Sequence, residues 1–410
     1  MIKKLLRFNW ILFFSMLALI AIGTSAIWSA GNAREAIFHG MWKAHLGTAL
    51  FSLVIYFVIA FTDYHNIVRW ISPILYALSL LMLVVVLFAG STIYGGRRWL
   101  WFFQPSEIAK LCTILFLSLI LSWRDEVASE KPQIDGREII DGENDEEETS
   151  GKRSGTFKIF CAASLDAAIP AFLILIEPDL GTTLALVPAV IAMIIAANIW
   201  RKGSFAILTI FAIAASFLFG AVYEAEKPGQ SAEKREAILK YVPLKNHQVK
   251  RIKTFLFPEA DQMGDGYTLK QSLIAISSGE MHGRGLGKAE TNRMKFLPSS
   301  VSMNDFIFCV WAEETGYMGS LLLLALFAIL CSSGAYVAWR AQDTCGRILA
   351  LGATTLIFAH AYINIAMCVG LVPITGLPLP FISSGRTFLL TAIIALALVQ
   401  SISIHKEIEE

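Results

Sequence analysis

The sequence predicts an all-α polytopic membrane protein, built as one transmembrane domain over residues 1–410. Of these residues 55% are hydrophobic and only 16% are charged, a balance typical of proteins embedded in lipid. Apolar runs of spanning length recur along the chain, and a backbone in lipid must satisfy its hydrogen bonds internally, as a helix does. We therefore expect ten transmembrane helices, at 9–30, 45–62, 68–90, 105–123, 158–176, 181–199, 204–223, 314–338, 347–370 and 385–404.

The positions of the basic residues predict the orientation of these helices. Cytoplasmic loops of membrane proteins are enriched in Lys and Arg. The first span and the loops of the same parity carry Lys3, Lys4, Arg7, Arg69, Arg201, Lys202, Arg340 and Arg347. This side, which includes both termini, should therefore be cytoplasmic.

Two hydrophilic segments interrupt the apolar pattern. Residues 124–157 are acidic and poor in aromatics, which predicts a disordered cytoplasmic loop. Residues 224–304, between the seventh and eighth helices, should form a large extracytoplasmic loop. That loop mixes aromatic, glycine, proline and charged residues, so we expect it to fold. Within it, residues 271–279 (QSLIAISSG) predict a short amphipathic helix that lies at the membrane interface.

Several classes of site are not supported by the sequence. None of the six cysteines falls in the long outer loop, so a disulfide framework is not expected. The seven histidines are scattered, and no His/Cys group has the spacing of a zinc site. No phosphate-binding glycine motif points to nucleotide-driven transport. The net charge of +1, without a basic patch, does not predict nucleic-acid binding.

Asp305 lies where the long hydrophilic segment meets the eighth apolar run, and Glu313 and Glu314 follow within that run. An acid at the edge of a membrane span is costly and needs a reason. One interpretation is that Asp305 caps the following helix, because Asp is favoured at that position. The other is chemistry on a lipid-linked substrate at the bilayer surface.

Residues 91–111 (STIYGGRRWLWFFQPSEIAKL) contain a second group of polar candidates. Arg97 and Arg98 fall in a short loop on the outer side, against the usual charge bias, which suggests a binding role toward a phosphate. Glu107 and Lys110 are three residues apart on one helix face and can form an ion pair facing the interior of the bundle. Such a pair is either structural or lines a cavity that holds an anionic head group.

The EPDLGTTL segment, residues 177–184, joins the fifth and sixth helices by a tight turn. We expect these two helices to form a hairpin with Asp179 as the N-cap of the second.

Near the C-terminus, residues 364–390 contain three prolines, which forbid a continuous helix. Broken backbone at membrane depth is allowed only where protein buries it or where it lines a cavity. His360 and Asn364, four residues apart, are expected to hydrogen-bond across helices, most simply as structural contacts.

Together these segments resemble the SEDS family (shape, elongation, division, sporulation), the polytopic peptidoglycan polymerases typified by RodA and FtsW. The resemblance covers nearly the whole chain except the acidic loop, and residues 244–256 are more similar to the RodA branch. The motifs are GGRRWL (95–100), FQPSEIAKL (103–111), EPDLGTTL (177–184), GDGYTLKQSLIAI (264–276), GRGLG (283–287), FLP (296–298), DFIF (305–308), AEETGYMG (312–319) and TGLPLPFISSG (375–385).

The resemblance implies a glycosyltransferase that joins lipid II units into glycan strands outside the cytoplasmic membrane. The family's catalytic acid, in a P-E-x-H-T-D-F-I-F pattern, falls on Asp305, which would act as general base toward the acceptor hydroxyl. The leaving group, undecaprenyl pyrophosphate, needs positive charge, from arginines, Lys110 or a divalent cation such as Mg or Mn. The expected substrate-binding residues are Arg97, Arg98, Trp99, Glu107, Lys110, Gln271, Ser383 and Ser384.

The resemblance also implies a location and a partner. The protein would be a multi-pass protein of the bacterial inner membrane, with its active site on the extracytoplasmic face. Its expected partner is a class B penicillin-binding protein, whose transpeptidase cross-links the strands. Two alternatives stay open, namely a flippase that moves lipid II across the bilayer and a non-catalytic scaffold of the wall-synthesis complex.

Near Asp305 the sequence departs from the family's pattern. Met303 and Asn304 stand in place of the His-Thr pair, and Ser299 in place of the Glu. The usual S-Y-G-G-S motif is S-S-G-R-T at 383–387, where Arg386 brings a new charge. These changes concern the fine geometry of the site and leave the expected fold unchanged.

Overall fold

A computed structural model provides the structure of the chain. It describes all residues except 1–5, 33–37, 94–95, 101–102, 130–144, 178, 200, 228, 243, 262–263, 291–302 and 406–410. The predicted FLP motif and Ser299 lie outside the described residues.

Within the described residues, nine helical spans are long and apolar enough to cross a membrane. They are α2 (Trp10–Asn32), α3 (Met41–Phe61), α4–α5 (Tyr64–Ala89), α6 (Pro105–Ser129), α7 (Asp145–Ile176), α9 (Arg201–Glu226), α15 (Ile307–Arg340), α16 (Thr344–Cys368) and α17 (Arg386–Ile404). Between α4 (Tyr64–Asn66) and α5 (Ser72–Ala89) lies one π-helical turn, η2 (Ile67–Ile71). The all-α membrane class is therefore confirmed. The remaining expected span, 181–199, corresponds to α8 (Leu180–Ala197), an apolar but shorter helix, so the count of ten stays a prediction.

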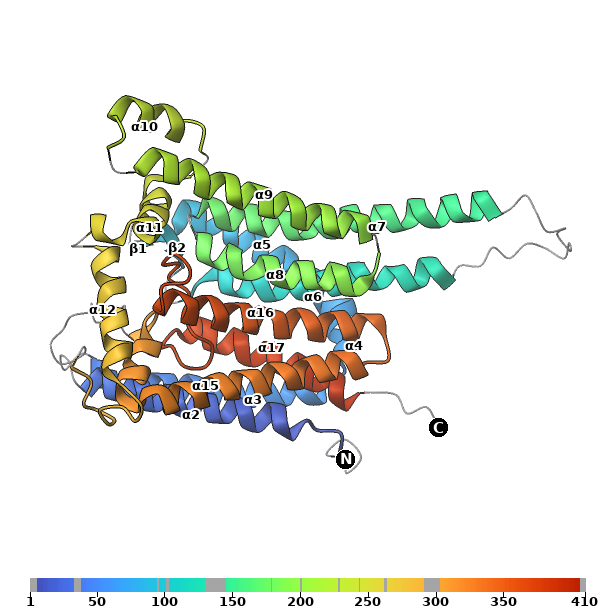
Figure 1. Ribbon diagram of the computed structural model, residues 1–410. Helices are drawn as coiled ribbons and strands as arrows, with labels where there is room; N and C mark the ends of the chain where they lie inside the picture. Colours follow the sequence, from blue (N-terminus) through green and yellow to red (C-terminus); the bar gives the residue numbers. More distant parts are fainter. Residues whose placement is uncertain are drawn as a thin grey trace, which may run out of the picture.

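The helices run side by side as one elongated bundle with both ends of the chain at the same end (Figure 1). The opposite end carries the hairpin of β1 (Ser91–Ile93) and β2 (Gly96–Trp99) and the helices α10 (Ala232–Leu239), α11 (Asn246–Leu256) and α12 (Asp265–Ser278). α12 runs across the bundle end rather than along it, as an interfacial helix would. The prediction that 271–279 is helical is confirmed, and helices account for much of the outer segment.

The predicted acidic loop, residues 124–157, differs from the expectation at both of its ends. α6 continues to Ser129 and α7 already begins at Asp145, so helices extend into the loop from both sides, while its disorder stays a prediction. The physical reason is that Glu, Lys and Arg are good helix formers, and acids in a first helical turn interact favourably with the helix dipole. The residues between the two helices lie outside the described part of the chain.

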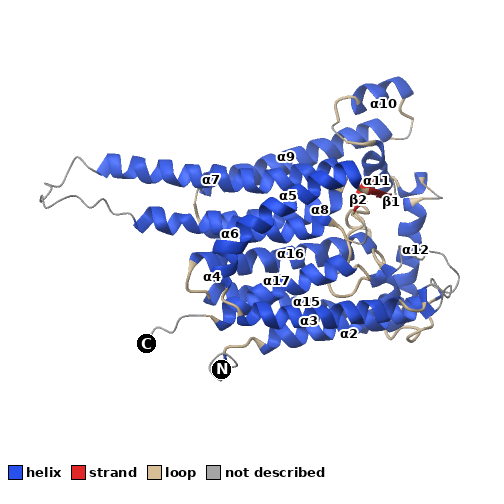
Figure 2. Cartoon of the chain, turned by 180° about the vertical axis from the view of Figure 1, so that it is seen from behind, coloured by secondary structure: helices blue, strands red, loops and turns tan. Residues whose placement is uncertain are grey.

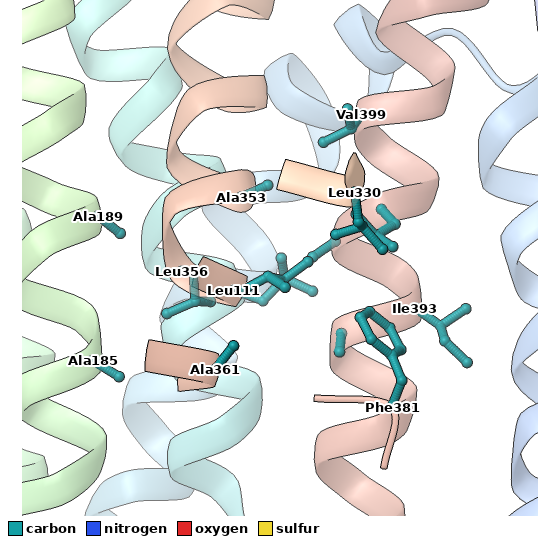
Figure 3. Packing of buried hydrophobic residues seen from close by; sticks show 14 of the residues in the cluster. Leu111, Ala185, Ala189, Leu330, Ala353, Leu356, Ala361, Phe381, Ile393 and Val399 are labelled. Carbon is teal, nitrogen blue, oxygen red and sulfur yellow. The ribbon is translucent and has the colours of Figure 1, made fainter. Parts of the chain in front are cut away.

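One large cluster of buried residues forms the packed interior, with α2, α6, α8, α15, α16 and α17 among the helices that contribute to it, and Figure 3 shows part of it. Small residues such as Ala185 and Ala189 on α8 and Ala353 on α16 are fully buried there. Without hydrophobic driving force between helices in lipid, close approach at small residues provides the packing contacts. Larger groups, among them Leu330 and Phe381, fill the remaining space.

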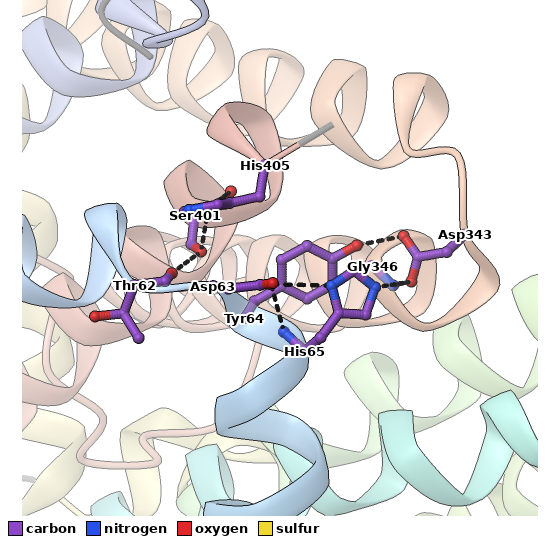
Figure 4. Close-up of polar contacts among 8 residues, drawn as sticks. All are labelled: Thr62, Asp63, Tyr64, His65, Asp343, Gly346, Ser401 and His405. Carbon is purple, nitrogen blue, oxygen red and sulfur yellow. Dashed lines mark hydrogen bonds and ion pairs between the residues drawn. The ribbon is translucent and has the colours of Figure 1, made fainter. Parts of the chain in front are cut away.

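At the end that holds the termini, a polar network ties three turns of the chain together (Figure 4). The Tyr64 hydroxyl donates to Asp343, which is also the N-cap of α16 through Gly346 N at 2.8 Å. His65 lies between two carboxylates, 2.9 Å from Asp63 and 3.5 Å from Asp343. These contacts fix α4 against the loop between α15 and α16.

A break in α15 shapes the other end. Gly316 has φ 68° and ψ −162°, a conformation that essentially only glycine adopts, so α15 consists of two helical pieces. The carbonyls of Glu313 and Glu314, freed by the break, accept from Arg284 N at 3.0 Å and Gly285 N at 2.9 Å. The loop that follows α12 therefore holds the short piece that Asp305 precedes.

Candidate active site

Asp305 lies in a turn directly before α15, at the bundle end that carries β1, β2 and α12. The N-cap of α15 is Phe306, and no side chain caps the helix there, so the interpretation of Asp305 as the cap is wrong. Its half-buried carboxylate is available for another role.

The turn around Asp305 is held by the proline-rich segment and by α16. Ser383 Oγ donates to Asn304 O at 2.6 Å, and Ser384 Oγ donates to the Asn304 side chain. Asn364 Nδ2 donates to Asp305 O at 2.8 Å and to Leu377 O at 2.6 Å. The expected cross-element bonding of Asn364 is thus confirmed. Two of the departures from the family pattern, Asn304 and Ser384, contact each other.

Arg251 of α11 lies beside Asp305. Its Nη1 donates to Thr375 O at 2.9 Å. A Cβ built on Gly376 would lie 3.4 Å from Asp305 Oδ2 and 3.8 Å from Arg251 Nη2, so both side chains face the same point. Burial raises the pKa of Asp305 to about 6, while the positive charge of Arg251 opposes that rise.

Arg98 of β2 and Asp179 form the next layer of the site. Arg98 Nη1 is 3.8 Å from Asp179 Oδ1, and Arg98 Nε donates to Glu177 O at 3.3 Å. Gln104 Nε2 donates to the other Asp179 oxygen at 2.9 Å. Asp179 also accepts from Thr182 N at 3.4 Å, which confirms its predicted role as N-cap of α8. The negative charge of Asp179 raises the pKa of Asp305, and the positive charge of Arg98 lowers it.

Glu177, in the same turn, is a fully buried carboxyl group. Burial and the negative charge of Asp179 raise its pKa to about 8, and Arg98 opposes this rise. Glu177 is therefore largely neutral at pH 7, which keeps the site from becoming more negative.

Lys110 and Glu107 form the predicted ion pair, buried inside the bundle, with Lys110 Nζ 3.0 Å from Glu107 Oε1. Lys110 Nζ is also 2.7 Å from His360 Nε2 on α16 and lies over the Phe388 ring, 5.6 Å from its centroid. The charge of Lys110 is thus surrounded by side chains from three helices, α6, α16 and α17.

For the other predicted substrate-binding residues, Arg97, Trp99 and Gln271, the structure shows no contact with the Asp305 site among the described side chains. Arg97 lies opposite Thr92 and Trp99 opposite Ser91 in the hairpin, where Trp99 is half-buried and the Arg97 side chain is outside the described part. Gln271 is half-buried on α12 and makes no hydrogen bond with the described site residues. The substrate-binding roles of these residues stay predictions.

Sequence reasoning missed Arg251 and Gln104 as members of the site. Arg251 is one of several basic residues in the segment 244–256, and nothing in the spacing of that segment distinguishes it. Gln104 stands just before the helix-opening Pro105, where a polar residue alone carries no signal.

The residues around Asp305 do not form a metal cage by themselves. In the described parts of the chain, no three His, Cys, Asp or Glu side chains gather as metal ligands. The carboxylates here face guanidinium groups instead. A Mg²⁺ ion, however, is often held by substrate phosphates and waters with few protein ligands.

Comparisons with known proteins agree with this architecture. The sequence model of the FtsW/RodA/SpoVE family, described as cell cycle protein, matches residues 3–408. The chain belongs to the SEDS family. Peptidoglycan glycosyltransferase MrdB of Escherichia coli (strain K12) is 30% identical over 397 residues, which cover 96% of this SEDS chain and 92% of that protein. Stage V sporulation protein E of Bacillus subtilis (strain 168) is 30% identical over 392 residues, covering 94% and 92%.

Solved structures show the same SEDS fold. The rod shape determining protein RodA of Thermus thermophilus has a TM-score of 0.62 at 21% identity, covering 98% of each chain. A chain of a peptidoglycan synthase complex that coordinates polymerization and crosslinking has a TM-score of 0.66 at 24% identity, covering 97% of each chain.

Proposed function

We propose that this protein is a peptidoglycan glycosyltransferase that polymerises lipid II for cell elongation and shape. The observation that carries the proposal is the position of Asp305, a half-buried carboxylate at one bundle end that faces the same point as Arg251. The names of the full-length relatives, peptidoglycan glycosyltransferase MrdB among them, support the activity.

In the proposed reaction the acceptor sugar hydroxyl attacks the anomeric carbon of the donor with inversion. Asp305 accepts the hydroxyl proton as the new C–O bond forms. The bond between the anomeric carbon and undecaprenyl pyrophosphate breaks, and the electron pair leaves with the pyrophosphate. The charge that develops there is stabilised by positioned cations.

Arg98 and Arg251 are the cations best placed for the pyrophosphate. Both act on the carboxylate of Asp305, and both are anchored to main-chain carbonyls, those of Glu177 and Thr375. Anchoring reduces the entropy lost when a guanidinium binds a phosphate. Lys110 is fully buried in its pair with Glu107, so its effect on substrate would be indirect.

A divalent cation, Mg²⁺ or Mn²⁺, remains part of the proposal. It would be held chiefly by the pyrophosphate oxygens and waters, and would supply positive charge to the leaving group. A polymerisation assay with a chelator tests this, because activity should disappear and return when either ion is added back. Unchanged activity in excess chelator would remove the cation from the mechanism.

We further propose that the partner is a class B penicillin-binding protein in the bacterial inner membrane, with the Asp305 end outside. The related chain in a synthase complex that couples polymerisation to crosslinking supports such a partner. The flippase alternative keeps two favourable observations, the break in α15 and the buried Glu107–Lys110 pair, since interrupted helices and internal charges also occur in transporters.

The decisive experiment compares the wild type with Asp305→Asn, each purified with its cognate penicillin-binding protein and supplied with labelled lipid II. The wild type should form long glycan strands, and the variant should lose at least about 100-fold of that activity while keeping its fold. Strand formation by Asp305→Asn at the wild-type rate would exclude the base assignment. If neither protein forms strands but both move lipid II between leaflets of vesicles, the flippase reading replaces the polymerase. If both proteins bind lipid II but neither forms strands nor moves lipid II between leaflets, the scaffold hypothesis replaces the polymerase.

A further inference from the structure

The orientation of the Asp305 carboxylate is not set by helical hydrogen bonds, because Asp305 lies in a turn before α15 begins at Ile307. Its direction depends on the two peptide groups that flank its Cα. The carbonyl of Asn304 belongs to the first of these groups, and the carbonyl of Asp305 belongs to the second. Fixing both carbonyls fixes the backbone dihedrals of Asp305.

Each of the two carbonyls has its own buried donor from a distant part of the chain. Ser383 Oγ donates to Asn304 O at 2.6 Å, and Asn364 Nδ2 donates to Asp305 O at 2.8 Å. Cys368 Sγ is a weaker second donor to Asp305 O at 3.6 Å. Ser383 is 2% exposed and Asn364 is fully buried, so water does not compete for these bonds.

The donors themselves are held in place. Ser383 Oγ accepts from Leu379 N at 2.8 Å, and Ser384 N donates to Met303 O at 3.2 Å. Asn364 Nδ2 is shared with Leu377 O. The segment that carries Ser383 is locked into the bundle at Gly23 of α2, where any Cβ would lie 2.4 Å from Phe381 O.

We propose that Ser383 and Asn364 are positioning residues for Asp305, which hold the carbonyls on both sides of its Cα and so aim its carboxylate at the reacting hydroxyl. This inference rests on the proposed function. It differs from the sequence expectation that Ser383 binds substrate, because the hydroxyl of Ser383 already has both a main-chain acceptor and a main-chain donor. The same geometry gives Asn364 a role in the site that goes beyond packing.

The test uses the complex with the penicillin-binding partner and labelled lipid II. Ser383→Ala should lower kcat by about 10- to 100-fold, because small displacements of a catalytic group are costly, and should leave lipid II affinity within about threefold. A loosened turn also lets water reach Asp305, so the acid limb of kcat should move to lower pH. Ser383→Cys, which keeps a weak donor of similar size, should recover part of the loss.

Ser118→Ala is the matched control, because it removes an equally buried serine hydroxyl that donates to Leu115 O within its own helix. It should leave kcat unchanged. Asn364→Ala should reproduce the kcat loss of Ser383→Ala, and thermal unfolding of each complex identifies any variant that does not fold.

Three results would overturn the inference. One is wild-type kcat in folded Ser383→Ala. Another is a loss of lipid II affinity that matches the loss of activity, which would make Ser383 a substrate-binding residue. The third is wild-type activity of Asp305→Asn measured in parallel, which would exclude Asp305 as the base and so remove the group that Ser383 and Asn364 are proposed to position. An inactive Asp305→Asn together with a fully active Ser383→Ala leaves the proposed function standing and rejects only the positioning role.

Discussion

The Asp305 carboxylate experiences two opposing influences. Burial raises its pKa, and the guanidinium of Arg251 lowers it, with burial the larger, so that the pKa lies at about 6 rather than near the usual 4. A general base works best when its pKa lies close to, but below, the working pH. The site therefore suits catalysis near neutrality.

This balance predicts a pH dependence with a definite sign. Asp305 acts as a base only in its ionised form, so kcat should be constant above pH 7 and should fall about tenfold per pH unit below about 6. Arg251→Gln removes a charge that favours ionisation, so the acid limb should move to higher pH. Polymerisation rates between pH 5 and 8, for the wild type and Arg251→Gln, provide the check.

Lys250→Gln serves as the control for that measurement. Lys250 neighbours Arg251 in sequence but is exposed and 3.4 Å from Asp261, away from the turn of Asp305. Its acid limb should coincide with that of the wild type. An acid limb that stays in place in Arg251→Gln would contradict the electrostatic coupling of Arg251 to the base.

At this scale the sequence predicted some members of the site and could not predict others. Asp305 and Arg98 were identifiable because a charge at the edge of an apolar run is costly, whatever the fold. The ion pair of Glu107 and Lys110 followed from helical spacing. Arg251 was not identifiable, since its place beside Asp305 depends on how α11 folds over the bundle end.

At the scale of elements, hydropathy located the helices but not their ends. The span was expected from residue 314, but α15 begins at Ile307. Glu313 and Glu314 interrupt the apolar run in the sequence, whereas protein buries the residues from Ile307 to Ala312. The two glutamates are accommodated by backbone donors, Glu290 N at 2.7 Å for Glu313 and Gly287 N at 3.1 Å for Glu314. No periodicity in the sequence predicts these contacts between α15 and the loop that follows α12.

The break at Gly316 leads to a stability prediction. An added Cβ would lie 2.4 Å from Gly283 N, and the positive φ of 68° disfavours other residues, so Gly316→Ala should destabilise the protein by about 3 kcal/mol. The measurement is the free energy or midpoint of thermal unfolding in detergent. Polymerisation should fall as well, because the junction holds the helical piece that follows Asp305.

Gly220→Ala, in α9, is the natural comparison. Nothing lies within 4 Å of a Cβ at Gly220, and replacing Gly by Ala inside a helix normally stabilises it by up to about 1 kcal/mol. This variant should unfold at or slightly above the wild-type temperature. Equal unfolding temperatures for Gly316→Ala and Gly220→Ala would show that the break does not require glycine.

At the scale of the whole molecule, the bundle separates its charges between two ends. Arg69, Arg340 and Arg347 lie at the end with the termini, where the network of Tyr64 and Asp343 also closes the turns (Figures 1 and 4). The opposite end gathers the site and α10 to α12. The sequence predicted this division from charge and length alone, because lipid restricts membrane proteins to few architectures.

The contacts between residues far apart in the sequence could not be predicted in the same way. The contacts of Asn364 and Ser383 with the Asp305 turn join residues about 60 to 80 positions apart. Such contacts depend on which helices are neighbours and on the course of the proline-rich segment. Figure 2 shows loops gathered among the helices at the bundle end that carries β1, β2 and α12. A single sequence predicts where the helices lie along the chain, whereas the structure is needed to show which helices contact each other.

The two ends allow a direct test of orientation. Tyr241, after α10, and Gln342, between α15 and α16, are both exposed and lie at opposite ends of the bundle. If the arginine-rich end is cytoplasmic, a membrane-impermeant maleimide should label Tyr241→Cys in intact spheroplasts and Gln342→Cys only after permeabilisation. The labelling of each variant is compared with that of the unsubstituted protein, because the six native cysteines can also react. The reverse pattern would place Asp305 in the cytoplasm, where a polymerase of exported lipid II could not act, and would contradict the proposed function at its foundation.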